Sequence, residues 1–197
     1  GAVHILSLKS MDGSLDLSRP ALSIGDGTAG LTLGAKDLFG SGVAFRRTAD
    51  GRLLLAVGAR NDDDGGSTGS NRGAVYILTL SLNPTDGSLS VASWVKISTE
   101  SGGLPPSTLT SDDRMGYGLA FVSDSVLVVG VWGHSERKGQ LLLLGLDSDL
   151  TVASVSSFSP PLGSVSRFAW SVAVVGDLDG DGGVDLVVGS PGLPCCE

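Results

Sequence analysis

The sequence predicts an all-β fold of short antiparallel strands, and two observations support this class. Thirty of the 197 residues are glycine, and Ser, Thr and Asp are frequent between short apolar runs. This is the composition of many turns joining many strands, whereas helices would show apolar residues at a 3.6-residue period. The apolar runs also recur in a fixed order along the chain, as in a repeat architecture. We therefore expect one all-β repeat array spanning residues 1–197.

Length and charge narrow the classes of partner. A chain of 197 residues buries roughly 70% of the surface that its unfolded form exposes, so it can build a core without cross-links. Thirteen Lys and Arg against 21 Asp and Glu give a net charge of −8, which repels phosphate backbones and anionic lipid headgroups. No apolar run reaches the roughly 18 residues needed to cross a bilayer. We therefore expect no nucleic acid partner and no membrane insertion.

Four strand types recur three times in the same cyclic order. The first type is LFGSGVAF at 38–45, RMGYGLAF at 114–121 and RFAWSVAV at 167–174; the second is LLLAVGAR at 53–60, VLVVGVWG at 126–133 and DLVVGSPG at 185–192. The third type is GAVHILSL at 1–8, GAVYILTL at 73–80 and GQLLLLGL at 139–146; the fourth is DLSRPALSI at 16–24, SVASWVKIS at 90–98 and TVASVSSF at 151–158. The repeated order predicts a unit of four strands.

The turns and the apolar runs predict how these strands are arranged. Asp-Gly pairs at 12–13 and 86–87 separate a third from a fourth strand, and such pairs supply the positive φ values of tight hairpin turns. The strands at 126–131 and 141–146 are apolar at successive positions, so both of their faces should be covered. Antiparallel four-stranded sheets stacked around an axis cover both faces, which predicts blades of the β-propeller type.

The order of the strands divides the array into about three blades' worth. Residues 1–24 hold strands three and four of a split blade, 38–98 and 114–158 each form a full blade, and 167–192 hold strands one and two of the split blade. A closed propeller needs four to eight blades. Either the chain is part of a longer propeller, or residues 1–24 of another copy complete the last blade. In the second case copies join head-to-tail, and the expected product is a filament.

Three stretches make the chain resemble the FG-GAP repeat family of integrin α-subunit propellers and of secreted microbial and algal proteins. They are Phe39-Gly40, the run VGDLDGDGGVDLVVGSPG at 175–192 and NRGAVYIL at 71–78. The second and third copies depart from the pattern, because they read MGYG and FAWS where the first has FG. The resemblance implies β-propeller blades in an extracellular or cell-surface protein that is structural or adhesive.

An aspartate-rich loop predicts a calcium site. Asp177, Asp179 and Asp181 alternate with small or apolar residues, and Asp185 follows. In a wrapped loop alternate carboxylates turn toward one point, and two like charges ~4 Å apart repel by about 4 kcal/mol at an effective dielectric near 20, so the loop needs a cation. All donors are oxygens with no His or Cys nearby, which favours Ca²⁺ over zinc. The resemblance adds the Gly183 carbonyl as a ligand, and we expect the ion to brace a hairpin.

The corresponding loops of the other copies have lost this pattern. Residues 48–52 keep only Asp50, and residues 122–126 form a loop too short to surround an ion. A separate acidic run at 61–65 is interpreted as a solvated loop, with weak calcium binding or a partner contact as the alternative.

No catalytic or cofactor-binding residue is predicted, and we expect no enzymatic activity. Residues 65–69 match a nucleophile-elbow pattern, but no helix is expected after them and the chain holds only His4 and His134 as bases. Gly25, Gly27 and Gly30 match a dinucleotide fingerprint, but the residues that follow cannot supply its helix.

The leading functional hypothesis is an extracellular structural or adhesive module, stabilised by calcium, whose partners are other copies of itself. One alternative is a carbohydrate-binding propeller that takes glycans, although we expect Trp94, Trp132 and Trp170 to pack between blades. Another is a non-catalytic part of a larger secreted enzyme or receptor. Cys195 and Cys196 are adjacent, so they are free, joined to each other, or bonded to another chain or segment.

Overall fold

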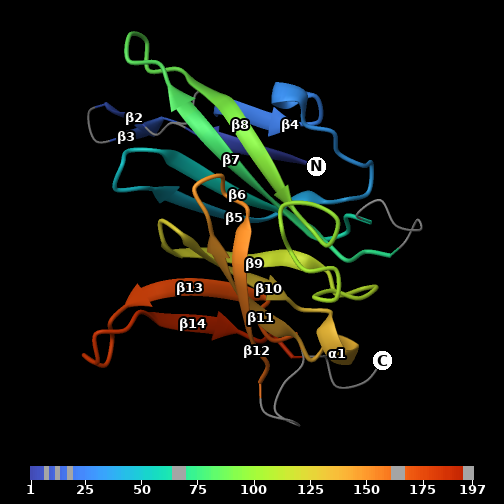
Figure 1. Cartoon of the computed structure of the whole chain (residues 1–197). Coiled ribbons are helices and arrows are strands. Elements are labelled where there is room, and N and C mark those ends of the chain that lie inside the picture. The colour runs from blue at the N-terminus through green and yellow to red at the C-terminus, as the bar shows by residue number, and fades with distance from the viewer. Residues whose placement is uncertain (7–8, 12–13, 17–19, 64–69, 161–166, 193–197) are drawn as a thin grey trace.

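A computed structural model describes the chain except residues 7–8, 12–13, 17–19, 64–69, 161–166 and 193–197, and the regular secondary structure of the described part is almost entirely strand (Figure 1). The predicted all-β class is therefore confirmed. The only helical segments among the described residues are a 3-10 turn at Thr28–Gly30 and one turn, α1, at His134–Arg137. The strands are β1 Ala2–Leu6, β2 Lys9–Met11, β3 Ser14–Asp16, β4 Pro20–Gly25, β5 Phe39–Arg47, β6 Leu53–Ala59, β7 Ala74–Leu82, β8 Leu89–Ile97, β9 Met115–Ser123, β10 Val126–Val131, β11 Gln140–Leu146, β12 Val152–Phe158, β13 Ser171–Gly176 and β14 Asp185–Gly189.

Two antiparallel four-stranded sheets form the centre of the molecule. Each is a meander in which sequential strands pair, in the orders β5-β6-β7-β8 and β9-β10-β11-β12. The pair β1–β4 forms a two-stranded sheet at one end of this stack, and β13–β14 forms another at the opposite end (Figure 1). The short pair β2–β3 lies between β1 and β4 in the sequence, and its predicted Asp-Gly turn falls outside the described residues. Antiparallel four-stranded sheets of the propeller-blade type are thus present.

The central residues of each strand pair have the same pairing register in all three copies. Third and fourth strands are matched by the pairs Val3–Ile24, Val75–Ile97 and Leu141–Phe158. First and second strands are matched by the pairs Val43–Val57, Leu119–Val129 and Val172–Val188. The central residues of each terminal two-stranded sheet therefore have structural counterparts in both complete sheets.

Successive sheets meet through backbone contacts at the start of each third strand. Gly73, just before β7, forms a parallel bridge with Met115 of the next sheet, and a Cβ built on Gly73 would lie 2.3 Å from the Met115 carbonyl oxygen. The corresponding Cβ positions of Gly1 and Gly139 would lie 2.0 Å from the Phe39 oxygen and 2.2 Å from the Phe168 oxygen. A side chain has no room at any of the three positions, so the same close contact joins each sheet to the next.

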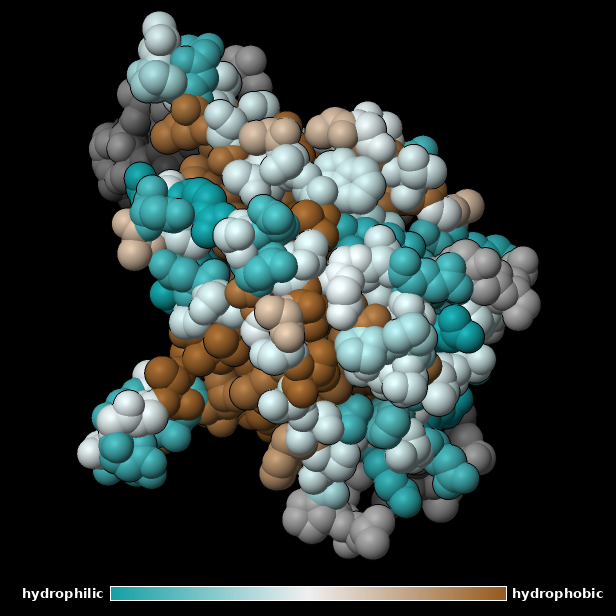
Figure 2. Space-filling view, in the orientation of Figure 1, coloured by the Kyte–Doolittle hydropathy of each residue, from teal (hydrophilic) through white to brown (hydrophobic). Residues whose placement is uncertain are grey.

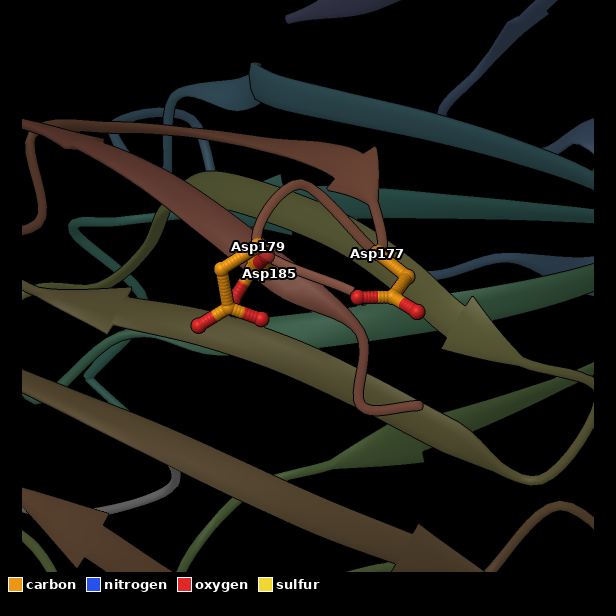
Figure 3. A group of neighbouring side chains, drawn as sticks. All are labelled: Asp177, Asp179 and Asp185. Atoms are coloured by element: carbon orange, nitrogen blue, oxygen red, sulfur yellow. The ribbon is translucent and has the colours of Figure 1, made fainter. Parts of the chain in front are cut away.

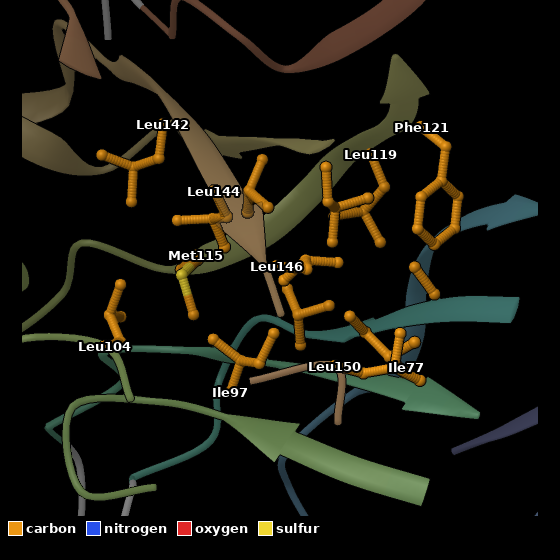
Figure 4. Packing of buried hydrophobic residues seen from close by; sticks show 14 of the residues in the cluster. Ile77, Ile97, Leu104, Met115, Leu119, Phe121, Leu142, Leu144, Leu146 and Leu150 are labelled. Carbon is orange, nitrogen blue, oxygen red and sulfur yellow. The ribbon is translucent and has the colours of Figure 1, made fainter. Parts of the chain in front are cut away.

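The largest core cluster lies between the two four-stranded sheets (Figure 4). Met115 at the start of β9 is fully buried there, together with Ile77 and Ile97 of one sheet and Leu142 and Leu144 of the other. Burying one such side chain contributes about 1.5–3 kcal/mol, so this interface holds the two sheets firmly together. Two smaller clusters join the terminal sheets β1–β4 and β13–β14 to the neighbouring four-stranded sheets.

Candidate metal centre

The predicted metal loop connects β13 and β14, and the sheet pairing fixes both of its ends. Asp177 directly follows the last residue of β13, and Asp185 is the first residue of β14. Gly176 and Asp185 are paired across the hairpin, which brings the two ends of the loop together. Within the loop Gly180 and Gly182 have φ values of 81° and 86°, a left-handed conformation that glycine adopts without steric cost.

Three of the loop carboxylates converge on one point (Figure 3). Asp177, Asp179 and Asp185 each offer an oxygen, and these oxygens all lie within 4.8 Å of one another. Calcium holds its oxygen ligands at 2.3–2.6 Å, so two ligands of one ion can be at most about 5 Å apart. The spacing of the three carboxylates therefore fits a single Ca²⁺ ion.

Backbone amides of the same loop orient these carboxylates. The Leu178 amide donates to Asp185 Oδ2 at 2.6 Å. Both oxygens of Asp177 accept hydrogen bonds, from the Gly180 amide at 2.8 Å and from the Gly182 amide at 3.0 Å. The loop thus wraps around its own acidic side chains, as a metal-binding loop does.

The remaining two predicted ligands, Asp181 and the Gly183 carbonyl, lie between Asp179 and Asp185 in the sequence of the loop. The Asp181 carboxylate is not part of the converging group, and its Oδ1 accepts a hydrogen bond of 2.6 Å from the Gly183 amide. The structure therefore brings together three of the five predicted ligand residues. Ligation by Asp181 and by the Gly183 carbonyl stays a prediction.

No described Lys, Arg or His forms an ion pair with a carboxylate of this loop. The two loops that have lost the pattern are different. In the β5–β6 turn Asp50 pairs with Arg52 at 3.0 Å, and in the β9–β10 turn Asp124 pairs with Arg46 at 2.7 Å. Each of these turns has an arginine to balance its carboxylate, whereas no described Lys, Arg or His pairs with the carboxylates of the loop after β13.

The Asp124 contact also links two neighbouring sheets. Besides Arg46, its carboxylate accepts a hydrogen bond of 2.7 Å from the Ala49 amide. The Ala49 amide first, and the Arg46 guanidinium second, hold the pKa of Asp124 below its usual value. A carboxyl whose folded-state pKa is lowered stabilises the fold above its unfolded pKa of about 3.9, and loses this contribution as the pH falls through the folded pKa.

We expect Asp124→Asn to lower stability at neutral pH and to flatten the loss of stability below about pH 4, because this carboxylate no longer takes up a proton on unfolding. Urea unfolding between pH 2 and pH 7 measures the effect. Arg46→Gln, which removes the second partner, should change the acid limb in the same direction. An acid limb identical to that of the unsubstituted protein would contradict the assignment.

The acidic run at 61–65 contains a buried carboxylate that the sequence analysis missed. Asp62 is only 3% exposed, and it accepts hydrogen bonds from the Tyr76 hydroxyl at 3.1 Å and from Lys96 Nζ at 2.8 Å. The interpretation as a solvated loop is therefore wrong for Asp62, while residues 64–65 lie outside the described part. Nearby, burial raises the pKa of Asp37, and the negative charge of Asp62 raises it further.

The histidines form hydrogen bonds with polar side chains of neighbouring strands and loops. His4 Nδ1 lies 2.9 Å from Ser23 Oγ, and His134 Nδ1 lies 3.3 Å from the buried carboxylate of Asp113. The nucleophile-elbow match at 65–69 and the cysteines at 195–196 fall outside the described residues.

The tryptophans contact other parts of the chain. Trp170 lies against Trp132, with ring centroids 5.3 Å apart, and against Tyr117, with centroids 4.2 Å apart. Trp94 Nε1 donates to the Ala29 carbonyl at 3.1 Å. These contacts are those of side chains that pack between strands and sheets.

Comparison with known proteins supports the resemblance seen in the sequence. Residues 33–78 match the FG-GAP repeat family, a stretch that includes β5, β6 and the first half of β7. No curated protein matches the chain. Among the described residues, no helix is long and apolar enough to span a membrane.

Proposed function

We propose that this chain is a calcium-stabilised structural or adhesive module of an extracellular or cell-surface protein. The premise is that it carries an FG-GAP repeat, as integrin-like β-propeller modules do. The observation that carries the proposal is the convergence of Asp177, Asp179 and Asp185 at the tip of a hairpin, where no described cation balances them. We propose no enzymatic activity, since the described histidines are engaged away from this loop.

The proposed ion would be held by Asp177, Asp179 and Asp185, with Asp181 and the Gly183 carbonyl completing the site. A bound divalent cation supplies positive charge that cancels the repulsion between the carboxylates. Because Asp177 directly follows one strand and Asp185 begins the next, an ion held by both would tie the two strands together at the loop. The expected role is therefore to brace the terminal hairpin.

Calcium should raise the melting temperature of the protein, and Asp179→Asn should abolish the rise. Asparagine keeps the oxygen that accepts the hydrogen bond from the Asp181 amide, so the substitution removes the charge with little change in the loop. Calcium at 100 times its dissociation constant stabilises by about 2.7 kcal/mol, which corresponds to roughly 5–10 °C in a domain of this size. Differential scanning calorimetry with calcium and with a chelator measures the effect.

A matched control is Asp86→Asn, which removes one acidic charge from the β7–β8 turn. Asp86 accepts a hydrogen bond from the Ser88 amide at 2.9 Å and belongs to no converging acidic group among the described residues. This variant should keep the full calcium response. Equal melting temperatures of the unsubstituted protein in calcium and in chelator would refute the metal site.

We also propose that copies of the chain associate head-to-tail through the strands at the two ends of the stack. Within the described residues, β1 pairs only with β4 and β14 pairs only with β13, so each has an open edge. Open edges of this kind accept a strand from another molecule. Head-to-tail contacts produce a filament if the rotation between copies does not close, and a ring if it does.

A further inference from the structure

Arginine and aromatic side chains pack together where the first strands of the sheets begin and the second strands end. Met115 and Val131 are paired across β9 and β10, so the loop before β9 and the loop after β10 lie at the same end of their sheet. The pairing of β5 with β6 and of β13 with β14 gives the corresponding loops the same position. We name the group the arginine stack, and its members are Arg60, Arg114, Tyr117, Trp132, Arg167 and Trp170.

Three aromatic rings form the middle of the arginine stack. The centroid of the Trp170 ring is 4.2 Å from that of Tyr117 and 5.3 Å from that of Trp132. Tyr117 belongs to β9, Trp132 directly follows β10, and Trp170 directly precedes β13. On the side of the first complete sheet, the guanidinium carbon of Arg60 lies 5.4 Å from the centre of the Tyr117 ring. The arginine stack therefore runs across successive sheets.

The other two arginines lie against the tryptophans. The guanidinium carbon of Arg114 is 5.3 Å from the centre of the Trp132 ring. That of Arg167 is 5.8 Å from Trp132 and 5.4 Å from Trp170, so this group contacts both indoles. A guanidinium is weakly hydrated, and stacking on an aromatic face fixes its plane. It can then bind a carboxylate through two parallel N–H groups with little loss of side-chain freedom.

Positive charge exceeds negative charge in the arginine stack. Arg60 and Arg167 form no ion pair with any carboxylate in the part of the chain that the structure describes. Arg114 Nη2 lies 3.1 Å from Asp112 Oδ1, but the Asp112 side chain is 62% exposed. The whole protein has a net charge of −8, so the arginine stack is a positive area on an acidic molecule. An acidic ligand is attracted to this area and repelled by the remainder of the surface.

Buried N–H groups in the same region lack acceptors. Among the described residues, four buried side-chain polar atoms have no hydrogen-bond partner, and three of them are the N–H groups Arg72 Nε, Trp132 Nε1 and Arg167 Nε. Trp132 is only 6% exposed, and the Arg72 carbonyl accepts a hydrogen bond of 2.9 Å from the Met115 amide at the start of β9. Buried polar groups are normally paired, so this region is rich in donors and poor in acceptors. It is complementary to a ligand that brings acceptors.

A cavity of about 240 Å³ adjoins the arginine stack, between the loop before β9 and the loop that contains α1. Arg114, Trp132 and Arg137 are among the residues that line it, and so are the carboxylates Asp112 and Glu136. Asp112 already accepts a hydrogen bond from Arg114. Sites that enclose a whole small-molecule ligand have volumes of about 300–1,000 Å³. The smaller cavity suits one side chain of a larger partner.

The surface on this side of the molecule is polar. In Figure 1, α1 lies on one side and the loop that joins β13 to β14 lies on the other. Figure 2, in the same orientation, shows mainly hydrophilic and intermediate residues on the side of α1, whereas a broad apolar area lies near the β13–β14 loop. A charged ligand fits the first side better than an apolar one. The calcium loop lies at the opposite end of the strands, because it joins the end of a first strand to the start of a second.

We infer that the arginine stack binds an acidic segment of a partner protein, whose carboxylates pair with Arg114 and Arg167 and place one acidic side chain in the adjoining cavity. Arg, Trp and Tyr are the residues that contribute most often to binding at protein interfaces. A sulfated polysaccharide also carries acceptors, but its charge continues along the chain and would meet the acidic remainder of the surface. The inference goes beyond the proposed function, because it assigns a second site that does not depend on calcium.

Titration with an acidic peptide tests the site. The probe is an acetylated and amidated peptide of alternating glutamate and glycine, and the same peptide with glutamine in place of glutamate is the control ligand. In a Trp94→Phe background only Trp132 and Trp170 remain as tryptophans, so a change in tryptophan fluorescence comes from the arginine stack. The glutamate peptide should change this fluorescence in a saturable manner, and the glutamine peptide should not.

Arg114→Gln and Arg167→Gln should each weaken binding of the glutamate peptide by about tenfold or more, because each removes a charge-assisted hydrogen bond. Arg167→Lys should recover only part of the affinity, since lysine keeps the charge but lacks the planar guanidinium. Arg47→Gln is the matched control. It removes the same charge from an exposed position at the opposite end of the strands, the last residue of β5, and should leave peptide binding unchanged.

Absence of binding by the glutamate peptide, or equal binding by all the variants, would overturn the inference. Arginine-dependent binding of a heparin-derived oligosaccharide without binding of the peptide would identify a sulfated glycan as the ligand and would overturn it as well. The titrations are run with calcium and with a chelator. Peptide binding under both conditions without a calcium response in melting experiments would refute the metal site alone, whereas a calcium response without peptide binding would refute this inference alone.

Discussion

Gly58→Ala should destabilise the protein by about 3 kcal/mol or more, although it adds a single methyl group. Gly58 lies within β6 and faces the backbone of the second complete sheet, so that a Cβ built there would lie 1.7 Å from the Gly116 carbonyl oxygen. The obstacle is backbone, so relief requires the two sheets to separate. Separation would loosen the main core cluster around Met115, and overpacking of a rigid core costs 1–3 kcal/mol, occasionally more.

Gly145→Ala provides a matched control in β11. The Cβ of that variant would meet Ser154 Oγ, a side-chain atom that can rotate away, so the loss of stability should be far smaller. Urea unfolding of both variants measures the difference. If the two substitutions cost the same, the backbone contact between the sheets is not the reason for glycine at position 58.

Asp62→Ala should lower the free energy of unfolding by about 2–3 kcal/mol. The buried carboxylate accepts hydrogen bonds from Tyr76 and Lys96, and Lys96 Nζ also lies 5.8 Å from the centre of the Tyr76 ring. Removing one partner of a buried ion pair costs about 3–5 kcal/mol, and the partial exposure of Lys96 places this pair at or below the lower end.

The double variant Asp62→Ala with Lys96→Met should recover part of this loss, because it removes the ammonium together with its anion. Chemical denaturation of the two single variants and the double variant completes a double-mutant cycle, which gives the interaction energy of Asp62 and Lys96. Asp50→Ala, which breaks the exposed pair with Arg52, should have a much smaller effect. Additive effects of the two single substitutions would show that the Asp62–Lys96 interaction contributes little.

The strands and their order were predictable because their signals are local and repeated. The stretches that begin at Gly1, Gly73 and Gly139 share a pattern of apolar residues, and each forms a third strand with the same register. Because the sequence is repeated, the same strand lengths and turn residues occur several times and support one another. The prediction of antiparallel four-stranded sheets is confirmed.

The details of the metal loop were less predictable, because alternate spacing alone does not determine where each carboxylate points. Asp177, Asp179 and Asp185 converge, whereas Asp181 accepts a hydrogen bond from the nearby Gly183 amide. Backbone amides compete with a metal ion for carboxylate oxygens, and the sequence carries no separate signal for that competition.

Interactions between distant residues were not predictable from local pattern. Asp62 bonds to Lys96, which is 34 residues away, and Asp124 bonds to Arg46, which is 78 residues away in the preceding sheet. The loss of the metal pattern at 48–52 and 122–126 was visible in the sequence. The pairing of Arg46 with Asp124 and of Arg52 with Asp50 was identified only by the three-dimensional arrangement.

The glycine contacts at the start of each third strand determine how such arrays can diverge. At Gly1, Gly73 and Gly139 one main chain rests on another, so the distance between neighbouring units is fixed by atoms that every amino acid shares. Mutation can then alter the loops and faces of individual units without changing their spacing. A gene that gains or loses one whole unit would preserve the geometry of the rest, provided that each new junction retains its glycine.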